Sequence, residues 1–575
     1  MIEKGWCVNL GDRLLWTGFT LFAVAFFLTY VGVKSDLRTF AAHDDALFVH
    51  QAESIASGHW LGDYHPLTLV KMPGYALFLS FVIKSGLPYL WVLSVFHIAA
   101  VAFLLHRSRY LFPGTGWLLL IAGFFLLFNP IFAGSLRIYR FQLTAIVFMV
   151  FLGSVVGLYE RAHRRSHWGV EIFGLLLAAL SWGLLWFSRE ENLLYTGCLA
   201  VGMTGYLLIA RSLVSPWWNL RFVLSGLFGV FGFWLFIAGM NVHHYGRFIV
   251  CEKTASPYPD LMRTFFSIAD PELDPRFLGS TASREKIRRV AMEVPEFQLM
   301  ADNLIKFASS WRGTYLDSET LTIREKPEGA LTVSHFEWAW MDAASASGYF
   351  RDGLTLAERY GELDEALTDA IADHRLRVDE PIRIQAGSYG LTGRDLAVIL
   401  RLMPRVYPDL FFTPSAVLRD YRDLTARVSR DRDENKDQRA RWASVLKVRY
   451  LDEGDEAGYL DCIATPANRF WNLATAAFAF IAIPLIHLAT PLAGLTLVVA
   501  ICRKRGDLAV AIAVMASTYL VHYLMLTALT VASGNHATTR GYFLPSFAPL
   551  ILTAFVSIGS LWSLRKRPAD HPRKV

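Results

Sequence analysis

Long apolar runs divide this sequence, and they constrain its fold more than any other feature. A run of about 18 or more apolar residues crosses the roughly 30 Å hydrocarbon core of a bilayer as one α-helix. About ten such runs lie near 14–33, 88–106, 115–132, 141–158, 169–187, 192–210, 221–241, 480–502, 508–531 and 544–563. Because 54% of the 575 residues are hydrophobic, the chain has too much apolar surface for an ordinary soluble protein. The sequence therefore predicts a polytopic α-helical membrane protein.

Basic loops between the runs predict how the chain is oriented, since positively charged loops stay on the cytoplasmic side. The strongest are HRSR at 106–109, ERAHRR at 160–165, and the RKR triplets at 503–505 and 565–567. All of these basic loops fall on the cytoplasmic side if both termini are cytoplasmic and if the first part of 470–502 is an interfacial helix that does not cross the membrane. The net charge of +6 is then explained by topology, and no nucleic-acid partner is expected.

A polar segment separates two predicted membrane modules. The N-terminal transmembrane module covers 1–242, with its first outer loop at 34–87, and the C-terminal transmembrane module covers 470–575. Between them, 243–469 is polar and contains helical-looking charged stretches. The predicted topology places it outside the cytoplasm as a large, mostly helical domain. A first run without a convincing small-residue cleavage site is read as a retained anchor, and the arginine-rich loops fit a bacterial inner membrane.

Two cysteines, Cys251 and Cys462, lie where the polar domain leaves and rejoins the membrane. An oxidising compartment permits a disulfide between them, which would close a very long loop. Two unrelated thiols fit the sequence equally well. The pairing is therefore a hypothesis, and a mass shift on alkylation without prior reduction would refute it.

The first outer loop opens with two adjacent carboxylates, Asp44 and Asp45. The apolar residues of 47–55 recur at helical spacing, which predicts a short amphipathic helix on the membrane surface. An N-cap accounts for one carboxylate at the start of that helix but not for two. Adjacent like charges raise each other's proton affinity and cost stability. The pair is therefore better suited to general-base work, or to binding hydroxyls or a metal ion.

Histidines in the same loop raise the question of a metal site. They are His43, His50, His59 and His65. Their spacing matches no compact zinc motif, and no cysteine is near them. Asp44 and Asp45 could hold a hard divalent cation through their oxygens, so the metal requirement stays open.

Several outer loops carry cations that short outer loops usually avoid. They are Lys71 in LVKMPGYALFL, Arg137 and Arg140 in SLRIYR, Arg189 in FSREEN, and Arg540 in TTRGYF. One explanation is an anionic ligand that these loops approach together, since Arg binds phosphate in a bidentate manner and Lys supplies a point charge. The alternative is pairing with carboxylates such as Glu190 and Glu191, or with lipid headgroups.

The order of these features resembles the GT-C superfamily of integral-membrane glycosyltransferases. A first membrane helix precedes an acidic pair, a surface helix ending in SGHWLG, and a K-x-P-G segment before another apolar stretch. The resemblance is to the branch with protein O-mannosyltransferases and the aminoarabinose transferase of lipid A. It covers roughly residues 10 to 240, returns weakly at 538–545, and leaves out the polar domain.

The resemblance implies roles for individual residues. Asp44 matches the catalytic base or acceptor-orienting carboxylate, Asp45 matches its neighbour, and Lys71 matches the lysine that faces the lipid phosphate. Two departures are Met72, where the family usually runs Lys-Pro directly, and a basic SLRIYR where many members have a second acidic site. Because of their positive charge, Arg137, Arg140, Arg189 and Arg540 are assigned to the donor phosphate. Glu190, Tyr542 and His65 are assigned as supporting residues.

The implied reaction moves a sugar from a polyprenyl-phosphate donor to a glycan, lipid or protein outside the cytoplasm. A single displacement of this kind inverts the anomeric centre. Two alternatives remain: a lipid or solute transporter, and an oligosaccharide ligase or polymerase with a diphosphate-linked donor. The aromatic-rich run at 334–350 could stack on sugar rings, although core packing is the favoured interpretation.

Overall fold

The computed structural model describes most of the chain. It covers residues 10–35, 37–39, 41–109, 116–134, 137–163, 168–189, 216–273, 277–278, 282–310, 314–325, 330–331, 333–379, 384–386, 389–391, 393–411, 436–450, 466–502, 512–527 apart from 514, 517 and 525, and 544–565. The predicted span at 192–210 and much of the one at 508–531 fall outside these residues.

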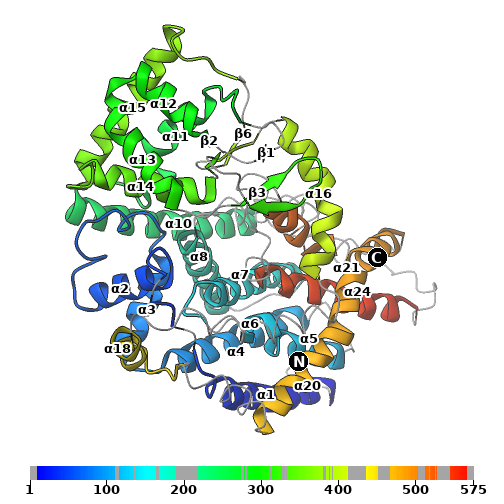
Figure 1. Cartoon of the computed structure of the whole chain (residues 1–575). Coiled ribbons are helices and arrows are strands. Elements are labelled where there is room, and N and C mark those ends of the chain that lie inside the picture. Colours follow the sequence, from blue (N-terminus) through cyan, green and yellow to red (C-terminus); the bar gives the residue numbers. More distant parts are fainter. Residues whose placement is uncertain are drawn as a thin grey trace.

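Apolar helices build the N-terminal part of the molecule (Figure 1). They are α1 (Leu10–Tyr30), α2 (Asp45–Ala56), α3 (Gly74–Ser85), α4 (Tyr89–Ser108), α5 (Gly116–Leu127), α6 (Pro130–Gly134), α7 (Phe141–His163), α8 (Trp168–Ser188) and α10 (Pro216–Tyr245). Four helical stretches of the described chain are long and apolar enough to cross a membrane: Arg13–Tyr30, Tyr89–Ser108, Val223–Tyr245 and Leu473–Cys502. The chain is therefore an integral membrane protein with a mostly helical fold.

The C-terminal part differs from expectation at 470–502. Instead of a separate interfacial helix, α20 (Pro466–Ala477) runs through a π-helical turn (Phe478–Ala482) into α21 (Ile483–Cys502). Pro484 lies two residues after the end of the π turn, and its missing N–H removes one helical hydrogen bond at this position. The last helix, α24 (Phe547–Arg565), packs against α5 and α21 and so joins the two membrane modules.

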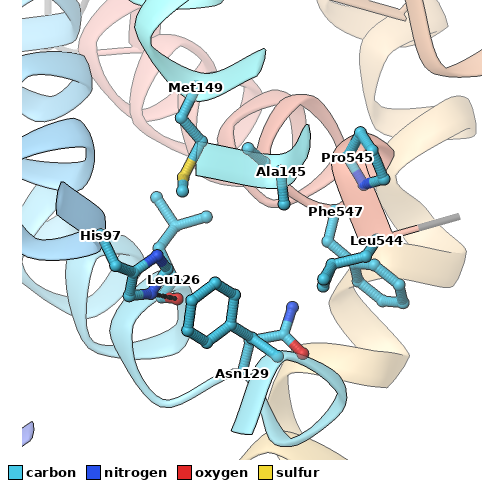
Figure 2. A pocket seen from close by; sticks show the side chains of 10 residues that line it. His97, Leu126, Asn129, Ala145, Met149, Leu544, Pro545 and Phe547 are labelled. Atoms are coloured by element: carbon cyan, nitrogen blue, oxygen red, sulfur yellow. Dashed lines mark hydrogen bonds between the residues drawn. The ribbon is translucent and has the colours of Figure 1, made fainter. Parts of the chain in front are cut away.

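A small cavity marks this junction. It is lined by His97 of α4, Leu126, Asn129, Ala145 and Met149, together with Leu544 and Phe547 at the start of the last helix (Figure 2). The His97 ring is buried, stacks on Phe132 at 3.9 Å and bonds through Nε2 to the Leu126 carbonyl at 3.2 Å. These contacts identify His97 as a packed core histidine.

The polar part of the chain is mostly helical, as the sequence predicts. Its elements are η2 (Glu252–Thr254), α11 (Tyr258–Ser267), α12 (Arg284–Glu293), η3 (Pro295–Phe297), α13 (Gln298–Ser310), α14 (Val333–Ala346), α15 (Gly353–Ala372), α16 (Gly393–Phe411) and α18 (Lys436–Leu446). Short antiparallel strands complete it: β1 (Phe277–Leu278) with β3 (Thr314–Asp317) and β4 (Ile323–Glu325), β2 (Ala282–Ser283) with β5 (Ala330–Leu331), and β6 (Ile384–Ala386) with β7 (Tyr389–Leu391). In Figure 1, α11 to α15 gather on one side of α10 and the N-terminal helices on the other.

An aromatic core holds α11 to α15 together. Phe265, Phe297, Phe336 and Trp340 are all buried there, and their rings contact one another. Two of these belong to the aromatic run at 334–350, so core packing is confirmed for them. Val70 of the first outer loop is buried in the same cluster, which brings the loop that carries Lys71 into contact with the polar domain.

Candidate active site

The predicted helix at the start of the first outer loop is present as α2. Its residues Leu47, Phe48 and Ala52 are buried, and the helix packs against α3. Its outer side meets α18, where Arg441 pairs with Glu53 at 2.9 Å. Asp44 occupies the N-cap position, but its side chain makes no capping hydrogen bond. The carboxylate of Asp44 is therefore directed to other partners.

Three side chains from separate parts of the sequence surround the Asp44 carboxylate. Lys71 Nζ lies 3.4 Å from Oδ1, and the Tyr139 hydroxyl donates to the same oxygen at 3.2 Å. The Arg137 guanidinium lies 3.8 Å from Oδ2. The Asp44 side chain keeps 36% of its surface exposed, whereas Lys71 keeps 8%. Asp44 is thus the carboxylate that a second molecule can reach.

Asp45 has a different environment from its neighbour. It is 0% exposed and forms an ion pair with Arg137, whose Nε lies 3.3 Å from Oδ1. The Arg137 guanidinium also lies 4.8 Å from the centre of the Tyr139 ring. Asp45 therefore holds Arg137, and Arg137 in turn lies against the tyrosine that donates to Asp44.

The two carboxylates have pKa values shifted in opposite directions. Burial opposes ionisation of Asp44, but the charges of Lys71, Arg137 and Arg140 outweigh it and lower its pKa. Burial raises the pKa of Asp45 to about 6, against the attraction of Arg137. Asp44 is therefore an ionised hydrogen-bond acceptor at neutral pH, which suits it to orienting a hydroxyl.

Two further predicted cations lie at the same end of the membrane helices. Arg140 is buried over the rings of Phe48 and Tyr139, and it donates to the Ser188 carbonyl at the end of α8 at 3.4 Å. Arg189 follows directly and lies 5.5 Å from the ring of Phe141. The structure thus brings Lys71, Arg137, Arg140 and Arg189 to one region, as the charge pattern predicts.

The K-x-P-G segment fixes Lys71 through close packing at Gly74. A Cβ built there would lie 2.5 Å from the Phe187 carbonyl oxygen, so only glycine allows α3 to approach α8 this closely. Met72, the residue that departs from the family pattern, is buried beside it. The preceding residues bind the polar domain, because the Glu252 N–H donates to Leu69 and Cys251 Sγ donates to Val70.

Glu252 is a buried carboxyl next to this loop. Arg247 NH1 lies 3.8 Å from Oε1, and neither carboxyl oxygen has a hydrogen-bond partner among the described residues. Burial raises the pKa of Glu252 to about 7, against the attraction of Arg247. The folded protein therefore binds this proton more tightly than the unfolded chain does, and the stability it contributes is lost as pH rises through about 7.

Glu252→Gln is therefore expected to raise stability at pH 8 and to change it little at pH 5. The gain is on the order of 3 kcal/mol, at roughly 1.4 kcal/mol per pH unit between the unfolded and folded pKa values. Denaturant unfolding in detergent at both pH values measures it. Equal effects at the two values would contradict this account of Glu252.

The site also contains residues that sequence reasoning did not assign to it. Tyr139 lies between the two flagged arginines of SLRIYR, and that position is the signal that could have found it. Trp338 approaches Lys71 from the polar domain, and Lys253 and His43 contact the ring of Trp338. The sequence presents His43 only as a candidate metal ligand, and Trp338 and Lys253 lie far from the first outer loop in the sequence.

Other predicted residues lie elsewhere or outside the described chain. His65 is exposed, and its Nδ1 accepts from the Leu67 N–H at 3.1 Å, which stabilises the loop locally. Glu190, Arg540, Tyr542 and Cys462 fall outside the described residues, so their roles and the Cys251–Cys462 pairing stay predictions. In the described part of the chain, no group of three or more His, Cys, Asp or Glu side chains could hold a metal ion.

Comparisons with known proteins give one kind of match. No family model and no curated protein matches the chain. It is similar to ArnT from Cupriavidus metallidurans in two crystal structures. The apo structure gives a TM-score of 0.31 and 14% identity, and it covers 96% of this chain and 78% of that chain. The structure bound to undecaprenyl phosphate gives a TM-score of 0.33 and 12% identity, and the match covers 95% of this chain and 78% of the ArnT chain.

Proposed function

We propose that this protein is a membrane glycosyltransferase of the GT-C kind. It transfers a sugar from a polyprenyl-phosphate carrier to an acceptor hydroxyl on a glycan, lipid or protein. The observation that carries this proposal is the placement of Asp44. An ionised, partly exposed carboxylate lies 3.4 Å from Lys71 and close to the charges of Arg137 and Arg140. Acceptor activation and stabilisation of an anionic leaving group are thus combined at one place.

An apolar groove beside Lys71 supports a lipid-linked donor. It encloses about 840 Å³ between the end of α8, the face of α10 and the segment that follows α10. Met72, the residue after Lys71, lines the groove, and so do Trp186 and Phe187, which precede Arg189 closely in the sequence. A polyprenyl chain in this groove would place its phosphate among the basic side chains. The extra residue in the K-x-P-G segment would then contribute to the lipid subsite.

The chemistry of transfer follows from these positions. The acceptor oxygen attacks the anomeric carbon, and the bond from that carbon to the phosphate oxygen breaks. Asp44 accepts the proton of the attacking hydroxyl. The phosphate leaves with the bonding electrons, and Lys71, Arg140 and Arg189 stabilise its negative charge. No enzyme nucleophile is required, so the product has the inverted anomeric configuration.

The same proposal fixes the placement in the membrane. Asp44, Lys71 and the arginines lie on the outer side of a bacterial inner membrane, and both termini are cytoplasmic. The domain boundaries are those given above: 1–242 as the catalytic membrane module, 243–469 as the outer domain, and 470–575 as the second membrane module. The outer domain touches the catalytic loop at Val70 and Trp338, which supports a role in completing the site.

Donor preference tests this function. The purified protein in lipid nanodiscs is given polyprenyl-phosphate sugars or polyprenyl-diphosphate glycans, with a membrane extract as the source of acceptor. We expect consumption of a monophosphate-linked donor and release of free polyprenyl phosphate. Consumption of diphosphate-linked glycans alone would favour the ligase alternative. A folded protein that consumes neither would favour transport.

Lys71→Gln is expected to lower kcat/KM for the donor by roughly 10²- to 10³-fold, because an ammonium aimed at the leaving phosphate is lost. Lys84→Gln is the matched control, since Lys84 is exposed at the far end of α3. Initial rates across donor concentrations measure both variants. A Lys71→Gln rate within about threefold of the control would remove Lys71 from the phosphate site.

A further inference from the structure

Trp338 is the exception in the aromatic run of α14. Its neighbours Phe336 and Trp340 are buried in the core of the outer domain, whereas Trp338 is partly buried and packs at the edge of that core. The ring contacts two residues of the first outer loop: His43, which precedes Asp44 in the sequence, and Lys71, which pairs with Asp44. Among the described residues of this run, Trp338 is the one whose ring contacts Lys71.

Three groups gather around this one indole ring. The His43 ring stacks on it with 4.3 Å between centroids and an angle of 25°. Lys71 Nζ lies 5.3 Å from the ring centre, and Lys253 Nζ lies 4.3 Å from it. A cation within about 6 Å of an indole face is attracted by the negative face of the ring. The stacked His43 covers ring surface that a sugar would need.

The indole is itself held in place from its own domain. Glu337, the adjacent residue, is buried and pairs with Lys253 through Nζ and Oε2 at 2.5 Å. Lys253 belongs to η2, and the preceding residue of the same element, Glu252, donates its backbone N–H to the Leu69 carbonyl of the loop. Trp338, Lys253 and Glu337 therefore form a unit, here called the indole clamp, that connects the outer domain to the catalytic loop.

The clamp affects Lys71 directly. Lys71 has Asp44 as an ion-pair partner at 3.4 Å on one side and the Trp338 ring on the other. A lysine ammonium on a flexible four-carbon stem otherwise samples many positions. The ring restricts the ammonium to the space between Asp44 and the outer domain. This is where an anionic group next to the groove would meet it.

We propose that Trp338 is a positioning residue that holds the Lys71 ammonium for the carrier phosphate. This role rests on the proposed function, because it specifies how the phosphate-facing lysine is oriented. It acts through Lys71 and requires no contact between the indole and the sugar. It also gives the outer domain a defined task at the membrane site.

A double-mutant cycle tests the coupling, with the affinity for polyprenyl phosphate and kcat/KM for the donor as readouts. Trp338→Leu is expected to weaken polyprenyl phosphate binding about tenfold in the wild-type background. In the Lys71→Gln background the same change is expected to have less than a twofold effect. Trp338→Phe keeps an aromatic face over the ammonium and is expected to stay within about threefold of wild type.

Equal losses from Trp338→Leu in both backgrounds would overturn the proposal, and so would no loss in either. Trp91→Leu is the matched control, because Trp91 is half exposed on α4 away from the site. If Trp338→Leu does not fold, the same cycle is measured with Trp338→Phe in place of Trp338→Leu. The expected loss of polyprenyl phosphate affinity is then smaller, and it is again expected only when Lys71 is present. The binding readout uses polyprenyl phosphate alone, so it decides the role of Trp338 even if no sugar donor is turned over.

Discussion

Asp44→Asn is expected to fold normally and to lower sugar transfer by about 10³-fold. Asparagine preserves the size of the side chain and can still accept hydrogen bonds from Lys71 and Tyr139. It cannot take the proton of an acceptor hydroxyl, and general-base groups contribute roughly 10²- to 10⁴-fold to rate. Donor affinity is expected to change less than turnover, because Asp44 acts on the acceptor. Initial rates and donor binding on the same preparation separate the two effects.

Asp63→Asn is the matched control for this prediction. Asp63 is an exposed carboxylate in the same outer loop and has no ion-pair partner among the described residues. Its variant is expected to transfer sugar at the wild-type rate. Near-normal turnover by a correctly folded Asp44→Asn variant would defeat the assignment of Asp44.

Arg137→Gln is expected to destabilise the protein more than any other single change at the site. Asp45 is fully buried, and its partner guanidinium would be lost. Removal of one member of a buried ion pair typically costs about 3–5 kcal/mol. Unfolding in detergent measures the loss directly.

The cost of Arg137→Gln is expected to depend on pH. The pKa of Asp45 is about 6 in the folded protein, above the ordinary value for an aspartic acid, so the folded state binds this proton more tightly. The associated stability is therefore lost as pH rises through about 6. Without Arg137 this pKa rises further, so the variant should be less impaired at pH 5 than at pH 8. The double variant Arg137→Gln with Asp45→Asn should recover much of the loss at pH 8. The same cost at both pH values, without recovery, would contradict this account.

The fold class followed from the sequence because membrane length is a simple physical constraint. Apolar runs at 88–106 and 221–241 became α4 and α10 with small changes at their ends. The run at 115–132 divided into α5 and α6, since Pro130 cannot continue a preceding helix. Residues 470–502 were harder to predict, because an uninterrupted helix with a π turn cannot be told from two shorter helices by hydropathy.

The site was predictable where a residue broke a general rule. Lys71 and Arg140 stood out because short outer loops avoid cations, and the structure places both near Asp44. The separate environments of Asp44 and Asp45 depend on burial, which adjacent residues in a sequence do not reveal. Trp338 lies inside an aromatic run in which its neighbours Phe336 and Trp340 are core residues, so the sequence does not distinguish it from them. Only the folded chain brings it to Lys71, across more than 260 positions.

The proposed reaction is a one-step transfer from a polyprenyl monophosphate carrier at Asp44. The most direct measurement follows free polyprenyl phosphate and transferred sugar together, in nanodiscs supplied with a panel of labelled donors and an acceptor extract. We expect that one donor is consumed, with one carrier released per sugar transferred, an inverted anomeric centre, and no release by Asp44→Asn. Release that is unaffected by Asp44→Asn, or no consumption of any donor by the folded protein, would contradict it.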